Sequence, residues 1–186
     1  MTGAIKLKIS GLLIALGVII ADQLSKWYVV TQFFDDTPRM DLIPWLMQKG
    51  EQLAYHSVSI TSFLNMVMVW NPGVSFGMLQ TNKAYVTYGL TIMALLVSLG
   101  FMVWLWRDPK PWRAISIGMI VGGALGNVWD RLRFGAVADF IDIHVMGYHW
   151  PAFNIADAAI TMGIVIILIE TLFFSSEKPA ASGSTL

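Results

Sequence analysis

Apolar residues in this chain fall into four long runs that are separated by shorter polar segments. Their pattern predicts helices over about 9–30, 84–106, 112–130 and 155–174. The second run has 23 residues without a formal charge, which is enough to cross a hydrocarbon core of about 30 Å. We therefore expect an all-α polytopic membrane protein with four transmembrane helices in a single membrane domain over 1–174. Residues 175–186, rich in Pro, Ala, Ser and Gly, are expected to form a disordered cytoplasmic tail.

The connection over 31–83 has a different pattern, in which apolar and polar residues alternate. The alternation at 57–61 and again at 64–70 predicts two strands, and Asn71-Pro72-Gly73 is typical of a turn. A returning strand at 74–78 is also expected, which gives a small extracytoplasmic β-sheet cradle on the membrane surface. The large apolar residues expected at the membrane interface are Phe33, Phe34, Trp45, Leu46, Trp70 and Phe76.

Composition supports a membrane environment. Of the 186 residues, 56% are hydrophobic and 13% are charged, whereas a soluble domain is roughly 45–50% apolar and about 25% charged. The chain has no cysteine, which excludes disulfides, thiolate metal sites and a cysteine nucleophile. There is no basic patch of the kind that binds nucleic acid, so we expect no nucleic-acid partner.

Basic residues predict the orientation in the membrane. They flank the helix ends that four alternating spans place on one side: Lys6, Lys8, Arg107, Lys110, Arg113 and Lys178. By the positive-inside rule both termini are cytoplasmic, and the connections 31–83 and 131–153 face outward. The first run could be a cleaved signal peptide, but residues 19–22 lack a small-x-small cleavage site. We expect this run to be retained.

Two aspartates, Asp139 and Asp157, lie in polar clusters between apolar runs. An ionisable group at membrane depth costs roughly 2.5–3.5 kcal/mol on insertion scales, so its presence indicates function. Two carboxylates that meet would suit acid/base chemistry on water, because neighbouring like charges separate their pKa values. Asp157 follows Asn154 by three residues, which also fits a helix cap. The helix dipole would favour Asp157 as the base, whereas Asp139, expected in an irregular segment, would keep a proton.

Further polar residues lie on the predicted helices. The spacing of Asn127, Asp130 and Arg131 predicts one shared face near the outer end of the third helix. This group either contains a self-satisfied Asp130–Arg131 pair or holds a substrate carbonyl. Gly122 and Gly126 form a small-xxx-small pair that permits close helix packing.

The first predicted helix offers a different candidate. Asp22 and Lys26, four apart, predict an ion pair. Ser25 and Lys26 could instead suggest a serine/lysine hydrolase, but adjacent helical residues point about 100° apart.

Five motifs in order resemble the bacterial lipoprotein signal peptidases (signal peptidase II), which are aspartic peptidases of the inner membrane. The resemblance covers nearly the whole chain and is carried by residues 22–26, 71–77, 122–131, 137–142 and 153–157. It implies four helices with an extracytoplasmic sheet cradle. The implied reaction is removal of the signal peptide from diacylglyceryl-modified prolipoproteins, with the cut just before the lipidated cysteine. The stretch around 41–57 is longer than usual for the family.

The resemblance also implies roles for individual residues. Asp139 and Asp157 match the catalytic pair; the residues matched to the substrate site are Asn71, Asn127, Arg131 and Asn154; those with a supporting role are Asp22, Lys26 and Asp130. No metal or cofactor is expected, the partners are lipidated prolipoproteins and membrane lipid, and a monomer is expected. A small transporter or channel with an acidic proton relay is the alternative, although it would need polar residues through the membrane midplane.

Overall fold

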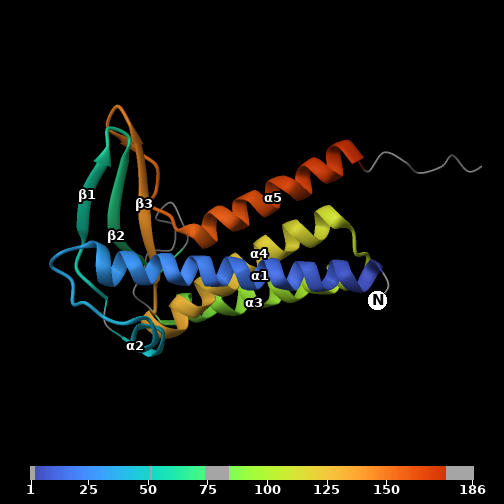
Figure 1. Ribbon diagram of the computed structural model, residues 1–186, viewed down its shortest axis with the longest axis horizontal. Helices are drawn as coiled ribbons and strands as arrows, with labels where there is room; N and C mark the ends of the chain where they lie inside the picture. Colours follow the sequence, from blue (N-terminus) through green and yellow to red (C-terminus); the bar gives the residue numbers. More distant parts are fainter. Residues whose placement is uncertain (1–2, 51, 74–83, 175–186) are drawn as a thin grey trace, which may run out of the picture.

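The computed structural model describes residues 3–50, 52–73 and 84–174. The long helices are α1 (Gly3–Tyr28), α3 (Ala84–Arg107), α4 (Pro111–Phe134) and α5 (Ile155–Phe174), and the π-helical turn η1 (Val29–Phe33) extends α1. A helix thus lies at each of the four predicted positions (Figure 1). A further short helix, α2 (Leu42–Met47), lies in the first connection. The expected strand at 74–78 and the expected disordered tail fall outside the described residues.

The sheet has four antiparallel strands in the order β1-β2-β3-β4. The strands β1 (His56–Thr61) and β2 (Leu64–Asn71) confirm the two strands predicted from alternation, whereas β3 (Val137–Val145) and β4 (Tyr148–His149) were not predicted. The expectation of an irregular segment around Asp139 is wrong. The two aspartates of β3 obscure its pattern, and pairing with β2, where Asp139 lies opposite Val69, makes the segment a strand.

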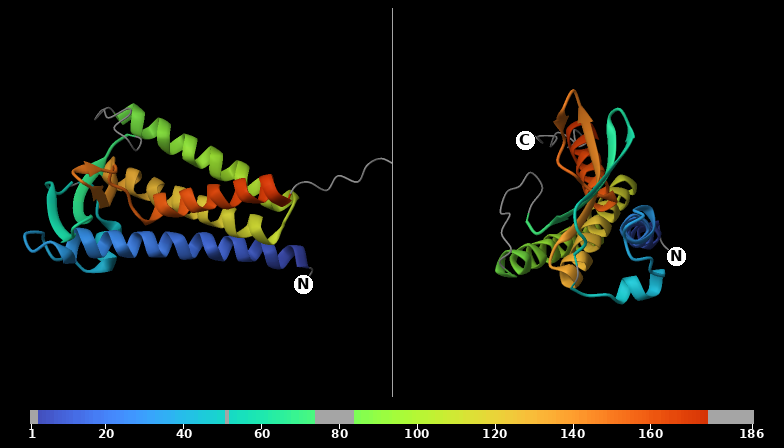
Figure 2. Two further views of the ribbon diagram at one scale, coloured as in Figure 1. Left: turned by 90° about the horizontal axis from the view of Figure 1, so that it is seen from above. Right: turned by 90° about the vertical axis from the view of Figure 1, so that its left-hand side faces the viewer.

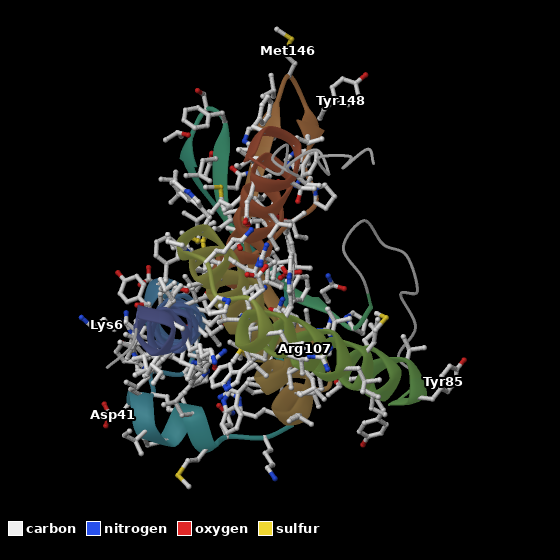
Figure 3. The ribbon with its side chains drawn as sticks, turned by 90° about the vertical axis from the view of Figure 1, so that its right-hand side faces the viewer. Lys6, Asp41, Tyr85, Arg107, Met146 and Tyr148 are labelled. Carbon is white, nitrogen blue, oxygen red and sulfur yellow. The ribbon has the colours of Figure 1, made fainter. Side chains whose placement is uncertain are left out.

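The sheet lies at one end of the helical bundle (Figures 1 and 2). The N-terminus, the α3–α4 connection and the end of α5 lie at the other end. Met146 and Tyr148 mark the tip of the β3–β4 hairpin, whereas Lys6 and Arg107 lie on α1 and α3 at the end away from the sheet (Figure 3).

Helix α4 is the central helix, because it packs against α1, α3 and α5. Its glycines allow this close approach. A Cβ added at Gly122 would lie 2.6 Å from the carbonyl oxygen of Ala15, and one at Gly126 would lie 2.6 Å from Asp22 Oδ2. The prediction that this small-xxx-small pair serves close packing is confirmed.

Within the described residues, three helical segments are long and apolar enough to cross a membrane: Gly3–Phe33, Tyr85–Arg107 and Ile155–Phe173. Helix α4 falls short of this by composition, because it carries Arg113, Asn127, Asp130, Arg131 and Arg133 among its apolar residues. Four of these polar residues, Arg113, Asn127, Asp130 and Arg133, are buried in the structure.

Two apolar cores stabilise the fold. One joins η1 to the sheet and contains Val29, Val30, Phe34, Met68, Ala138 and Phe140. The other lies within the bundle around Leu105, Ile117 and Val121. Phe34 and Trp45 were expected at the membrane interface, but they are only 3% and 1% exposed. That expectation is wrong for these two residues, because the connection folds back onto the sheet and the end of α4.

Candidate active site

Asp139 and Asp157 reach the same cavity from two different elements. Strand β3 supplies Asp139, and the first turn of α5 supplies Asp157. The cavity has a volume of about 320 Å³ and lies between α3, α4 and α5 beside the sheet. Most of its remaining wall is apolar and includes Leu90, Met93, Val97, Phe101, Ile120, Ile160 and Ile164. The two carboxylates are therefore among the few polar groups of an apolar cavity.

Two asparagines link these carboxylates. Asn154 donates from Nδ2 to Asp139 Oδ1 at 2.7 Å, and Asn127 donates from Nδ2 to Asp157 Oδ1 at 2.8 Å. The two amides also meet, since Asn154 Nδ2 lies 3.2 Å from Asn127 Oδ1. A continuous chain of hydrogen bonds thus fixes the relative position of the two carboxylates.

Asn154 and Asp157 also form the start of α5. The backbone N–H of Asp157 donates to Asn154 Oδ1 at 3.0 Å, and the backbone N–H of Asn154 donates to Asp157 Oδ2 at 3.3 Å. This reciprocal arrangement is a capping box. The capping interpretation is confirmed, and the helix dipole favours negative charge on Asp157 in this first turn.

Asp139 is 1% exposed and has a shifted pKa. Burial and the neighbouring charge of Asp157 raise the pKa of Asp139 to about 7, against the opposing effect of hydrogen bonds from Asn71 and Asn154. Asn71, at the end of β2, donates from Nδ2 to Asp139 Oδ2 at 3.1 Å. A carboxyl group of this pKa can hold a proton at neutral pH and give it up during a reaction.

The side chain of Arg131 lies in the cavity wall and does not pair with the side chain of Asp130. Its Nη2 donates to the carbonyl oxygen of Gly73 at 3.1 Å, next to the turn that Asn71 begins. Asp130 is fully buried and pairs with Lys26 and Arg133 instead. The three residues predicted to share one face of this helix therefore have different surroundings. Asn127 and Arg131 lie at the cavity, and Asp130 lies behind it. The alternative of a self-satisfied Asp130–Arg131 pair is wrong.

Behind the cavity, α1 and α4 bury a cluster of charges. Lys26 Nζ lies 2.8 Å from Asp22 Oδ2 and 2.7 Å from Asp130 Oδ2, and all three side chains are at most 1% exposed. The predicted Asp22–Lys26 ion pair is confirmed. Lys26 also donates to Asn127 Oδ1 at 3.2 Å, which connects the cluster to the cavity. Ser25 donates to the backbone oxygen of Asp22, so it does not form a dyad with Lys26.

Asp142, the other acid of β3, lies outside the cavity. Residues three apart on a strand face opposite sides, so Asp142 and Asp139 cannot share a site. Burial would raise the pKa of Asp142, but hydrogen bonds from Asn65 and His149 outweigh this effect and lower it. Asp142 is therefore held ionised at the sheet.

Sequence reasoning missed two residues near the site. Gln23 donates to Asp22 Oδ2 and to Asp130 Oδ1, each at 3.0 Å. Arg133 contacts Asp130 and Gln23 and is almost completely buried. Gln23 lies next to Asp22 within the motif of residues 22–26, and this position could have identified it from the sequence. For Arg133 the only local signal was Asp130, three residues earlier, because its other partners, Gln23 and Trp45, come from distant parts of the chain.

Comparison with known proteins places these features in a family. A profile of signal peptidase (SPase) II matches residues 14–173. The lipoprotein signal peptidase of Acinetobacter baumannii is 36% identical over 166 residues, which cover 88% of this chain and 84% of that protein. The one from Polynucleobacter necessarius is 34% identical, with 92% and 94% covered.

The fold has solved relatives as well. A bacterial membrane enzyme structure, obtained by the in meso method at 2.3 Å resolution, is similar with a TM-score of 0.66 and 30% sequence identity over 94% of both chains. These similarities do not favour the transporter or channel alternative. With the profile matching most of the length, the chain belongs to the signal peptidase II family, whose members are peptidases of the aspartic type.

Proposed function

We propose that Asp139 and Asp157 are the catalytic pair with which this enzyme removes signal peptides from prolipoproteins. Family membership supports the reaction. The observation that carries the assignment is that both carboxylates line one apolar cavity and are bridged by Asn127 and Asn154. Aspartic peptidases use two such carboxylates to activate water and to protonate the substrate.

The roles within the pair follow from their surroundings. Asp157, in the first turn of α5, takes a proton from a water molecule, whose oxygen attacks the scissile carbonyl carbon. Asp139, with its raised pKa, donates its proton to the carbonyl oxygen. When the C–N bond breaks, Asp157 passes the proton that it took from water to the leaving amide nitrogen, and Asp139 regains a proton from a hydroxyl of the tetrahedral intermediate. Cleavage of the peptide bond leaves a carboxylate on the signal peptide and an amine on the lipoprotein.

The cavity wall suits the apolar stretch of a signal peptide. Apolar side chains of α3, α4 and α5 line the cavity together with the two carboxylates. At its polar end, Arg131 and Asn71 lie beside the carboxylates and can donate to backbone carbonyls of an extended substrate. In this arrangement the substrate's apolar segment lies among the helices, and its cleavage site lies at the sheet.

A membrane-anchored substrate is the second part of the proposal. The substrate carries a diacylglyceryl group on the cysteine after the cut, and each buried methylene of its chains contributes about 0.8 kcal/mol to membrane binding. The lipid thereby holds the cleavage site at the level of the two carboxylates. We further propose that the enzyme acts as a monomer.

The proposed placement has four spans in a bacterial inner membrane, with both termini cytoplasmic and the sheet outside. Helix α4 would be the remaining span, third in chain order, because it runs alongside the three apolar helices (Figure 1) and its residues Arg113, Asn127, Asp130 and Arg133 are buried. The start of α1, which carries Lys6 and Lys8, and the α3–α4 connection, which follows Arg107 and contains Lys110, lie at the end away from the sheet, as the positive-inside rule requires for a cytoplasmic end.

Paired precursors test this proposal. Purified enzyme is incubated with one prolipoprotein in diacylated and unlipidated forms, and the released signal peptide is quantified by mass spectrometry. Cleavage before the lipidated cysteine, with little turnover of the unlipidated form, is the expected result. Equal turnover of both forms would contradict the role given to the lipid, and activity in Asp139→Asn would contradict the catalytic assignment.

A further inference from the structure

Arg133 is a buried cation that the mechanism above does not use. It lies near the end of α4, is 6% exposed, and is not among the side chains that line the catalytic cavity. Its Nη1 donates to the backbone oxygen of Trp45 at 2.8 Å, and its Nη2 donates to Gln23 Oε1 at 2.9 Å. The same Nη2 lies 3.4 Å from Asp130 Oδ1. One guanidinium therefore joins α2, α1 and α4.

Helix α2 and the residues after it enclose this guanidinium. The Trp45 ring lies over it, with 4.3 Å from the guanidinium carbon to the ring centroid, and the Phe134 ring lies at 4.5 Å. The backbone N–H of Gly50 donates to the carbonyl oxygen of Arg133 at 3.0 Å. Figure 2 shows α2 beside the ends of α1 and α4. Excluding water in this way strengthens the attraction between Arg133 and Asp130.

Asp130 connects Arg133 to the strand that carries Asp139. Its Oδ1 accepts from Gln23 and Arg133, whereas its Oδ2 accepts from Lys26 and, at 3.3 Å, from the backbone N–H of Ala138. Ala138 immediately precedes Asp139. Its carbonyl oxygen also accepts from Asn154, the residue that hydrogen-bonds Asp139. The position of Asp130 thus sets the position of the β3 backbone at the cavity.

We propose that Arg133, held by α2, is a positioning residue for catalysis. It fixes Asp130, and Asp130 holds the backbone of Ala138 so that Asp139 points into the cavity. The inference rests on the proposed catalytic role of Asp139. It gives α2 a function in the reaction, although α2 contributes no side chain to the cavity.

A purely structural role would have different consequences. A buried ion pair contributes little net stability, because the cost of removing its two charges from water offsets much of their attraction. Small misplacements of a reacting group, in contrast, can reduce the rate about a hundredfold. Arg133 touches no part of the cavity, so its loss should lower kcat and leave KM unchanged.

Charge gives a second distinguishing property. Asp22, Lys26, Asp130 and Arg133 together carry two positive and two negative charges. Asp139 is faced by Asp157 of α5, Lys26 of α1 and Arg131 of α4. Removing the charge of Arg133 leaves the buried group negative, which disfavours ionisation of Asp139. The decline of kcat with rising pH should then move to higher pH.

The test compares Arg133→Gln and Arg133→Lys in the full-length enzyme with a lipidated precursor, with kcat expressed per folded molecule. For Arg133→Gln we expect kcat to fall about ten- to a hundredfold with unchanged KM, and the decline of kcat with pH to move upward. Arg133→Lys keeps the charge and should recover part of kcat and the wild-type pH at which kcat declines. The controls are Leu105→Ala, which removes a buried side chain from the bundle core, and Met47→Ala, at an exposed position of α2.

Wild-type kcat in Arg133→Gln would overturn the proposal. So would a loss of kcat that Leu105→Ala reproduces and that leaves the decline of kcat with pH unmoved, because Arg133 would then act on stability alone. If Arg133→Gln does not fold, Arg133→Lys decides, and wild-type kcat in that variant overturns the proposal. Activity in Asp139→Asn would instead refute the catalytic assignment itself, so the two failures are distinguishable.

Discussion

Asn154 caps helix α5 with its side-chain oxygen and holds Asp139 with its side-chain nitrogen, which lies 2.7 Å from Asp139 Oδ1. One amide therefore joins the start of a helix to a strand that precedes it in the chain. The two functions use opposite sides of the amide, because the cap needs an acceptor and Asp139 needs a donor. They can consequently be separated by substitution.

Asn154→Ser and Asn154→Ala separate them. Serine keeps a cap acceptor but cannot reach Asp139 with an amide, whereas alanine loses both. We expect Asn154→Ala to cost about 1 kcal/mol of stability and Asn154→Ser much less. Both should lose most of their turnover, because Asp139 is no longer held. Thermal unfolding in detergent and turnover of lipidated precursor measure the two effects. Recovery of activity in Asn154→Ser would show that the cap alone matters.

The pH dependence of turnover should follow the proton on Asp139. Burial and the charge of Asp157 raise the pKa of Asp139 to about 7. The group is protonated below that pH and loses its proton above it, so turnover should decline as the pH rises through about 7. A kcat–pH profile measured on one lipidated precursor checks this. A rate that stays flat from pH 6 to roughly 9 would contradict a proton donor of this kind.

Asn71 provides a matched test of the same group. Its hydrogen bond lowers the pKa of Asp139, so Asn71→Ala should move the decline in rate to higher pH. Asn65 on the same strand donates to Asp142 at 2.8 Å, away from the cavity. Asn65→Ala should therefore leave the profile unchanged. Equal shifts in both variants would point to a general effect on the sheet.

Arg131 should be sensitive to a change that preserves its charge. Its guanidinium contacts the carbonyl oxygen of Gly73 and lines the cavity, and a lysine cannot reproduce that planar group of donors. We expect Arg131→Lys to reduce turnover by up to about a hundredfold with little change in thermal stability. Arg39→Lys, at an exposed position, is the control. Retained activity in Arg131→Lys would remove Arg131 from the substrate site.

The close contact between α1 and α4 predicts opposite effects at two glycines. A Cβ at Gly122 would lie 2.6 Å from the backbone oxygen of Ala15, so Gly122→Ala must force the helices apart. A Cβ at Gly100 of α3 meets nothing within 4 Å. Gly100→Ala should therefore stabilise by about 0.5–1 kcal/mol, the helix propensity of alanine over glycine, whereas Gly122→Ala should destabilise. Unfolding temperatures of the two variants measure this difference.

The sequence predicted the features that depend on local pattern. Continuous apolar runs marked the positions of α1, α3, α4 and α5, and alternation marked β1 and β2. The capping box at Asn154 and the ion pair of Asp22 with Lys26 followed from spacing alone. In each case the interacting residues are close in the chain, so periodicity was sufficient.

The remaining features depend on contacts between distant segments. Strand β3 forms because it pairs with β2, and its own residues mix acids with apolar side chains. Asp130 faces Lys26 and not Arg131, because α1 lies on that side of α4. Trp45 is buried by the end of α4 although its local sequence suited a membrane interface. None of these partners can be identified from spacing within one element.

The most direct test of the account is the turnover of a diacylated precursor by Asp139→Asn and by Asp157→Asn. Each variant replaces one carboxylate by an amide of the same shape, so membrane insertion and thermal unfolding should remain close to wild type. Asp142→Asn, on the same strand but outside the cavity, is the control and should retain turnover. The account predicts that both cavity variants lose all detectable cleavage while Asp142→Asn cleaves. Cleavage near the wild-type rate by either cavity variant would contradict it.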